Sequence, residues 1–231
     1  MSSSIAARSR ARSEVSIDFG GQRWRLLPGR AAMWEERRWL ILADVHFGKA
    51  AAFRARGVPV PEGTTQETLQ RLDDLLEHEQ PEVVVFLGDL FHARESHAAA
   101  TLGTLTAWRE RNAALPLLLI EGNHDLSAGA PPPALRIEVE AEPWCVDGIA
   151  FCHHPQRVHG ASAWAGHLHP AVRLNGRADD GVRLPCFWSR PELGVLPAFG
   201  SFTGSARIDR EDGDRVIAIA DDRLYEIPVL A

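Results

Sequence analysis

The chain has 231 residues, of which 45% are hydrophobic, and its formal net charge is −6. This length suits one compact domain with a real core rather than two. The negative charge excludes a basic field over the whole surface, whereas proteins that live on DNA usually show a basic face or stripe. Any nucleic-acid site must therefore rest on local positive charge.

The cysteines and the N-terminus indicate the cellular context. Cys145, Cys152 and Cys186 are odd in number and irregularly spaced, unlike a disulfide framework or a Cys-rich zinc site, so we expect a reducing cytoplasm. Residues 1–15 predict a flexible Arg/Ser-rich arm, with an organelle transit peptide as the alternative, and residues 16–231 predict a single domain. No stretch approaches a membrane span.

The first half of the chain alternates between strands and helices. Segments 35–44, 81–89 and 115–125 are apolar runs that end in polar residues, which is typical of buried strands. Residues 64–79 and 97–112 carry apolar residues at helical spacing. This alternation predicts a parallel sheet with helices packed on it.

The second half is rich in Gly and Pro and contains short alternating runs such as GIAFCHHP, AVRLNG and RVIAIADD. Such runs predict a mostly antiparallel β region with tight turns. With no clear linker between the halves, the chain as a whole belongs to the α/β class.

Five short motifs gather His, Asp and Asn at the ends of apolar runs. They are Asp44-Val45-His46, Gly88-Asp89, Gly122-Asn123-His124-Asp125, His153-His154 and Gly166-His167-Leu168-His169. Open α/β sheets carry their sites beyond the carboxyl ends of the strands. Residues two apart on an extended strand point to the same side, so Asp44 and His46 are expected to face one ion together. The same argument applies to His167 and His169.

The ligand types indicate the kind of metal. Nitrogen and oxygen donors without sulfur suit Mn, Fe or Zn better than Ca or Mg, and do not choose among the three. Each motif alone is weak, because Gly-Asp and Gly-Asn are common in turns. All five in order, with six of the chain's ten histidines, predict a metal centre.

At these motifs the sequence resembles the calcineurin-like metallophosphoesterase superfamily, whose signature is D-x-H, G-D, G-N-H-[DE], a further His and G-H-x-H. The resemblance implies a four-layer α/β/β/α sandwich of two mostly mixed sheets. It also implies two divalent metal ions that share one carboxylate. One ion would be held by Asp44, His46, Asp89 and His169, and the other by Asp89, Asn123, His153 and His167. His153 is chosen over His154 because the superfamily usually places the ligand first in such a pair.

A closer resemblance extends over nearly the whole chain. Segments such as ADVHFGKAAAFRARGVPVPEGTT, LGDLFHAR, AGHLHPAVRL and GVLPAFGSFTG are similar to the bacterial ligase-associated DNA damage response endonuclease family. This resemblance implies a phosphodiester substrate such as DNA and an association with a DNA ligase and other repair proteins. A homodimer stays open.

Further residues have expected roles around the metals. His124 follows a ligand and is expected to protonate the leaving alkoxide, while Asp125 would hold its imidazole. His92, three residues after Asp89, is a candidate catalytic residue that either faces the substrate or supports a ligand. Arg54 and Arg173 are candidates for binding substrate phosphates, with solvated surface positions as the alternative.

Three functions follow from these expectations. The first is a Mn²⁺-dependent phosphodiesterase or endonuclease in DNA repair. The second is a phosphatase or phosphodiesterase for a small nucleotide or metabolite, which the acidic net charge favours. The third is a non-catalytic partner module on the same fold, which the intact motifs oppose.

Overall fold

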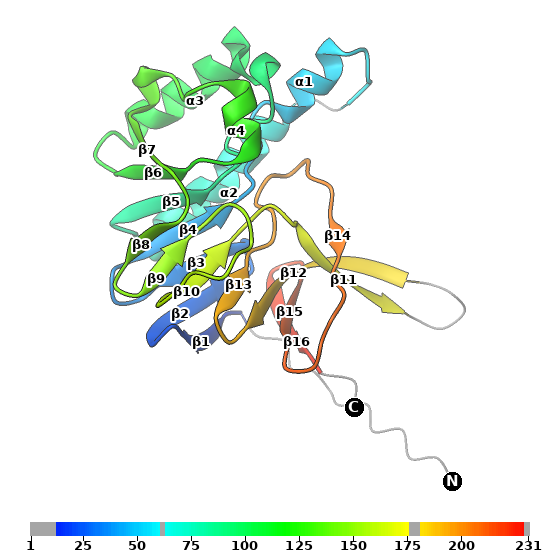
Figure 1. The fold of residues 1–231 in the computed structure, drawn as a ribbon. Helices are drawn as coiled ribbons and strands as arrows, with labels where there is room; N and C mark the ends of the chain where they lie inside the picture. The colour runs from blue at the N-terminus through cyan, green and yellow to red at the C-terminus, as the bar shows by residue number, and fades with distance from the viewer. Residues whose placement is uncertain (1–12, 61–62, 176–180, 229–231) are drawn as a thin grey trace.

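The computed structural model describes residues 13–60, 63–175 and 181–228. Most of the expected arm lies outside these ranges, and its last residue, Val15, is buried and opens the first strand. The described residues form two sheets that face one another, with helices packed on the outer side of the first sheet (Figure 1). The expected α/β fold with two mixed sheets is confirmed.

As far as the structure describes the chain, the first sheet has seven strands in chain order. Strands β1 to β4 form an antiparallel meander, and β4 to β7 are parallel. Their bounds are β1 (Val15–Phe19), β2 (Gln22–Leu27), β3 (Ala31–Trp34), β4 (Trp39–Ala43), β5 (Val83–Leu87), β6 (Leu117–Ile120) and β7 (Ile137–Glu140). The parallel β4, β5 and β6 confirm the predicted alternation. The sequence analysis does not predict β1 to β3 or β7.

In the described residues, all helices lie between residues 49 and 135. They are α1 (Lys49–Ala55), α2 (Thr64–Glu79), the 3₁₀ helix η1 (Arg94–His97), α3 (Ala99–Arg111), α4 (Asn123–Ala128) and the 3₁₀ helix η2 (Pro133–Leu135). Helix α2 has the predicted bounds, and α3 falls within the predicted 97–112. Segment 115–125 is strand only as far as Ile120, because Asn123 already begins α4.

Within the described ranges the second sheet has nine strands, and most neighbours in it are antiparallel, as expected. The parallel pairs are β9–β10, β10–β13 and β11–β14. The strands are β8 (Trp144–Val146), β9 (Ile149–Phe151), β10 (Ser162–Ala165), β11 (Pro170–Asn175), β12 (Gly181–Arg190), β13 (Leu193–Val195), β14 (Ala206–Arg207), β15 (Arg215–Ala220) and β16 (Arg223–Ile227).

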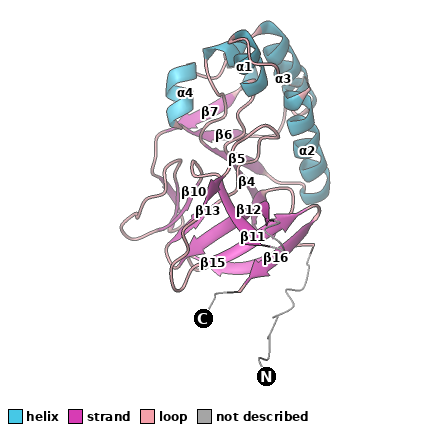
Figure 2. Ribbon diagram, turned by 90° about the vertical axis from the view of Figure 1, so that its right-hand side faces the viewer, coloured by secondary structure: helices cyan, strands magenta, loops and turns pink. Residues whose placement is uncertain are grey.

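Two apolar layers hold the molecule together. Between the sheets, Trp24 and Trp34 of the first sheet and Trp164 of the second are fully buried, and the rings of Trp24 and Trp164 meet edge to face at 5.3 Å. Burial of such large rings is the main favourable term for joining the sheets. On its other side the first sheet packs against the helices (Figure 2). The described residues place no helix on the outer face of the second sheet, where the four-layer description implies one.

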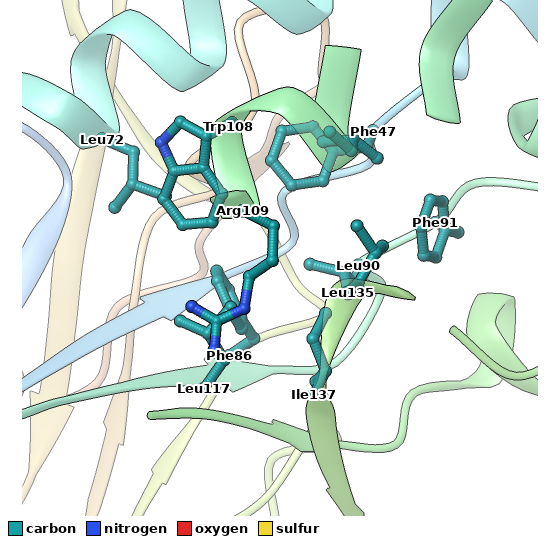
Figure 3. Close-up of a pocket in the computed structure, with 11 residues that line it drawn as sticks. Phe47, Leu72, Phe86, Leu90, Phe91, Trp108, Arg109, Leu117, Leu135 and Ile137 are labelled. Atoms are coloured by element: carbon teal, nitrogen blue, oxygen red, sulfur yellow. The ribbon is translucent and has the colours of Figure 1, made fainter. Parts of the chain in front are cut away.

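A small cavity lies inside the helix-side layer (Figure 3). Its volume is about 20 Å³, and Phe86, Trp108 and Leu117 are among its apolar walls. Arg109 also lines it, and the guanidinium donates to the carbonyl of Asn112. The cavity has room for about one water, so it is a packing gap of the core and not a substrate site.

Candidate metal centre

Polar side chains follow three neighbouring parallel strands of the first sheet. Asp44 and His46 come after β4, Asp89 after β5 and Asn123 after β6. The segments are joined by backbone hydrogen bonds, from the N–H of Asp44 to Gly88 O at 3.3 Å and from the N–H of His46 to Asp89 O at 2.9 Å. The ends of parallel strands meet at one edge, so these side chains converge as predicted.

Five of the converging residues have a left-handed backbone. The φ angles are 52° for Asp44, 51° for His46, 51° for Asp89, 67° for His167 and 48° for His169. Such angles cost on the order of 1–3 kcal/mol each outside Gly, and they concentrate at functional sites. The expectation that the paired residues share one side of an extended strand is therefore wrong. They converge because the chain turns sharply beyond each strand end.

One group of side chains surrounds Asp44. Ligand atoms of Asp44, His46 and His169 all lie within 4.8 Å of one another. The Nε2 atoms of His46 and His169 are 3.3 Å apart, and His169 Nε2 is 3.6 Å from Asp44 Oδ1. Two imidazole nitrogens and a carboxylate that face one point are the donors expected around a divalent transition metal.

A second group surrounds His153. Its Nε2 is 2.9 Å from Asn123 Oδ1 and 3.1 Å from His167 Nδ1. The side chain of His153 is fully buried, whereas that of His154 is 44% exposed and its Nδ1 lies 2.6 Å from Glu142 Oε1. The three histidines still form one possible metal group, so geometry favours His153 as the ligand without excluding a role for His154.

Asp89 lies between the two groups. Its Oδ2 is 3.7 Å from His46 Nε2, and its Oδ1 is 3.4 Å from His153 Nε2. The backbone N–H of His124 donates to Oδ1 at 2.9 Å. Each carboxylate oxygen thus faces a different histidine group, which is the arrangement of a shared ligand.

The hydrogen bonds of His153 Nδ1 and His169 Nδ1 also fit metal binding by these two rings. His153 Nδ1 lies 3.0 Å from Leu87 O, and His169 Nδ1 lies 3.0 Å from Gly204 O. A carbonyl oxygen accepts only, so these nitrogens carry the protons and leave Nε2 free to bind a metal. Asp44 and Asp89 are also almost completely buried. Two buried carboxylates are costly together unless cations lie between them, so the residues fit a divalent metal centre.

His124 lies at the rim of this cluster. Its Nδ1 is 2.7 Å from the backbone carbonyl of His92, and its Nε2 is 3.9 Å from Asp89 Oδ2. The His92 ring stacks on the His124 ring at 4.7 Å and meets the His46 ring edge to face. His92 therefore packs against two rings of the cluster, and its role in catalysis or support stays a prediction. Burial is the largest cause that lowers the pKa of His92 to about 4.

The expected contact between Asp125 and the His124 imidazole is not formed. Asp125 Oδ1 accepts the N–H of Phe91 at 3.0 Å, and Oδ2 accepts the N–H of Gly122 at 3.0 Å. The reason is that Asp125 is buried at the start of α4 and turns back to tie the loops after β5 and β6. Burial raises the pKa of Asp125 to about 6 against these two bonds.

The two arginines expected to bind substrate are both exposed. Arg54 lies at the end of α1, with Nη1 3.5 Å from Val60 O. Arg173 lies on β11, in register with Arg183 of β12, on a hairpin that extends away from the helices (Figure 1). A role for either side chain in binding substrate stays a prediction.

Two residues near the cluster were missed by the sequence analysis. Lys49 lies close to Asp89 and Asp44, whose charges favour its protonated form, although burial is the larger effect and lowers the pKa of Lys49. Its spacing of three residues after His46 is the only signal in the sequence. Glu142 accepts the N–H groups of His153 at 2.7 Å and His154 at 2.8 Å, and no motif announces it.

Two facing mixed sheets with a His/Asp cluster at a shared edge define a metal-dependent phosphoesterase, and the comparisons with known proteins agree. The chain matches the family model described as calcineurin-like phosphoesterase over residues 37–197, and it belongs to that family. The structure is similar to that of the Pseudomonas putida nuclease MPE, with 40% identity over 93% of this chain and 100% of that chain and a TM-score of 0.83.

A second solved structure, Yfce, a phosphoesterase from E. coli, is 15% identical over 80% of this chain and 90% of that chain, with a TM-score of 0.38. No curated protein matches the chain significantly. The expected resemblance to a metallophosphoesterase is confirmed, and so is a metal-dependent hydrolase activity on phosphoesters.

Proposed function

We propose that this protein is a two-metal phosphodiesterase that cleaves DNA. The observation that carries the proposal is the position of Asp89, whose two oxygens face two different histidine groups. One ion would be held by Asp44, His46, Asp89 and His169, and the other by Asp89, Asn123, His153 and His167. Mn²⁺ is the proposed ion, and the nitrogen and oxygen donors also suit Fe or Zn.

Two bound divalent ions would lower the pKa of a water and neutralise charge on the phosphate. His124 then has the position of a proton donor to the leaving alkoxide. The His92 carbonyl accepts from Nδ1–H of His124, which directs Nε2 toward the cluster, where the imidazolium form would present an Nε2–H. Asp125 and His92 act indirectly, since Asp125 ties the two loops and His92 packs on the His124 ring.

DNA as the substrate is supported by similarity to the P. putida protein, which is described as a nuclease. The resemblance to ligase-associated endonucleases supports a role in DNA repair beside a ligase. None of the helices in the described residues is long and apolar enough to cross a membrane.

An activity panel with added Mn²⁺ tests the proposal. It compares a chromogenic phosphodiester, a phosphomonoester, cyclic nucleotides, and linear and circular DNA. We expect cleavage of circular DNA that disappears in Asp89→Ala. Hydrolysis of cyclic nucleotides or the monoester alone would contradict DNA as substrate and support the small-molecule alternative.

A further inference from the structure

A cleft leads away from the metal centre along the side of His169. A first part of about 140 Å³ is lined by His169, Arg30 and Pro185 among others. A second part of about 600 Å³ shares Arg30 and Pro185 and adds Arg71 of α2. A chain that leaves the metal centre on this side would meet Arg30 first and Arg71 next.

The two arginines are partly buried, and they donate to backbone and hydroxyl oxygens. Arg30 Nη1 donates to Ala198 O at 3.3 Å, while Arg71 donates to Phe199 O at 2.6 Å and to Ser201 Oγ at 3.2 Å. In the described part of the chain neither forms an ion pair with a carboxylate. A guanidinium has five N–H donors, so most of their donors stay available for an anion.

Arg25 differs from Arg30 and Arg71 because acidic side chains neutralise its charge. Arg25 of β2 forms ion pairs with Glu14, Glu35 and Glu79, so its charge is satisfied within the fold. Arg30 lacks such neighbours, and its pKa is lowered by burial and then by the charge of Arg71. Two acids lie near the pair: Glu67, whose charge acts on both arginines, and Asp221, which lines the second part of the cleft.

Residues 198–201 contact both arginines and also the backbone of Asp44, which is a proposed metal ligand. Besides accepting from Arg30 and Arg71, residues 198–201 bond to the strand end at β4, since Phe199 N–H donates to Ala43 O at 2.8 Å and Gly200 N–H to Asp44 O at 3.2 Å. The Arg71 guanidinium also lies over the Phe199 ring at 5.4 Å. These contacts hold the guanidinium groups of Arg30 and Arg71 in a fixed position relative to Asp44.

We propose that Arg30 and Arg71 bind non-scissile phosphates of a polynucleotide strand whose scissile phosphate lies at the metal centre. This proposal rests on the proposed function and names the surface that would select a polymer over a small ester. Preorganised guanidinium groups suit phosphate oxygens, and a bound phosphate relieves the repulsion between the two arginines. The two arginines also supply the local positive charge that the acidic chain requires.

The test compares two substrates of one enzyme. We expect Arg30→Gln and Arg71→Gln to lower the ratio of kcat/KM for a single-stranded oligonucleotide to that for a chromogenic phosphodiester by about 10-fold each. The salt dependence of oligonucleotide binding should fall by about 0.7 in log–log slope for each lost phosphate contact. Arg71→Lys keeps the charge and should recover part of the ratio.

The control is Arg111→Gln, an exposed arginine of α3 that pairs with Asp73 at 3.6 Å and should leave the ratio unchanged. Equal losses on both substrates would overturn the proposal, since they would indicate that the arginines only support the fold. An unchanged ratio and salt slope would also overturn it. If the wild type fails to cleave the oligonucleotide but hydrolyses the chromogenic ester, the proposed function is wrong. The proposed binding of phosphates by Arg30 and Arg71 is then wrong as well.

Discussion

The two sheets contribute to the cluster in different ways. The first-sheet edge (Asp44, His46, Asp89 and Asn123) follows parallel strands, and its two carboxylates and His46 are buried. The second-sheet edge (His153, His167 and His169) is less enclosed, because only His153 is fully buried.

Atoms of the first sheet position much of the second-sheet edge. The His167 N–H donates to both oxygens of Asp44, and His153 Nδ1 faces Leu87 O. The difference suggests that the first-sheet edge is set by strand pairing, whereas the second-sheet edge depends on contacts with it. Changes in the first-sheet edge should therefore disturb both groups, and changes in the second should act locally.

The largest effect is expected for Asp44→Asn. This side chain contacts His169 and holds the His167 backbone, so both edges lose order as well as one ligand charge. We expect turnover of a phosphodiester to fall by at least about 10³. Asp74→Asn, on the exposed side of α2, is the matched control and should leave turnover unchanged. A loss of turnover of less than tenfold in Asp44→Asn would contradict the dependence of the second-sheet edge on the first-sheet edge.

His124→Ala should have the next largest effect, and it should depend on the substrate. Metal content is expected to stay at the wild-type value, while turnover of a diester with a poor leaving group falls by about 10². A substrate with a good leaving group, which needs no proton, should be affected much less. His78→Ala on α2 serves as the control, because His78 is exposed. Equal losses on the two substrates would exclude the proton-donor role.

Glu142→Gln tests how the second-sheet edge is supported. The carboxylate accepts two backbone N–H groups and faces the His154 ring, and although burial raises its pKa, bonds from His154 and His153 lower the pKa of Glu142 overall. We expect Mn²⁺ affinity to fall by roughly 10-fold, as is typical for residues that hold metal ligands. Glu140→Gln, on exposed β7, should leave metal binding unchanged. If Glu142→Gln binds Mn²⁺ with wild-type affinity, strand pairing alone is enough to position His153.

The smallest effect on chemistry is expected for Asp125→Asn. Its two oxygens accept two backbone N–H groups, and an amide offers only one acceptor oxygen. The unfolding free energy of the metal-free protein should fall by about 1–3 kcal/mol, measured by urea denaturation. Turnover with saturating Mn²⁺ should change less than in His124→Ala. The opposite order would return Asp125 to a direct role beside His124.

The sequence predicts the first-sheet edge better than the second-sheet edge. Asp44, Asp89 and Asn123 stand at the ends of apolar runs, and parallel strands bring such ends together without further information. The left-handed backbone of Asp44 and Asp89 leaves no comparable signal in one sequence, which is why the expected extended geometry is wrong.

Contacts between distant segments are harder to predict. Glu142 reaches the histidines from an irregular segment, and Arg30 and Arg71 both donate to residues 198–201, which lie far from either in the sequence. The bonding of Asp125 to Phe91 and Gly122 likewise depends on how two loops pack. Spacing along the chain carries no information on these contacts.

Anomalous diffraction from crystals grown with Mn²⁺ tests most directly whether two ions share Asp89. We expect two Mn²⁺ peaks about 3.5–4 Å apart, one beside each oxygen of Asp89. One would contact His46 and His169, and the other Asn123 and His153. A single peak under saturating Mn²⁺, or two peaks of which only one contacts Asp89, would contradict the sharing of Asp89 by two ions.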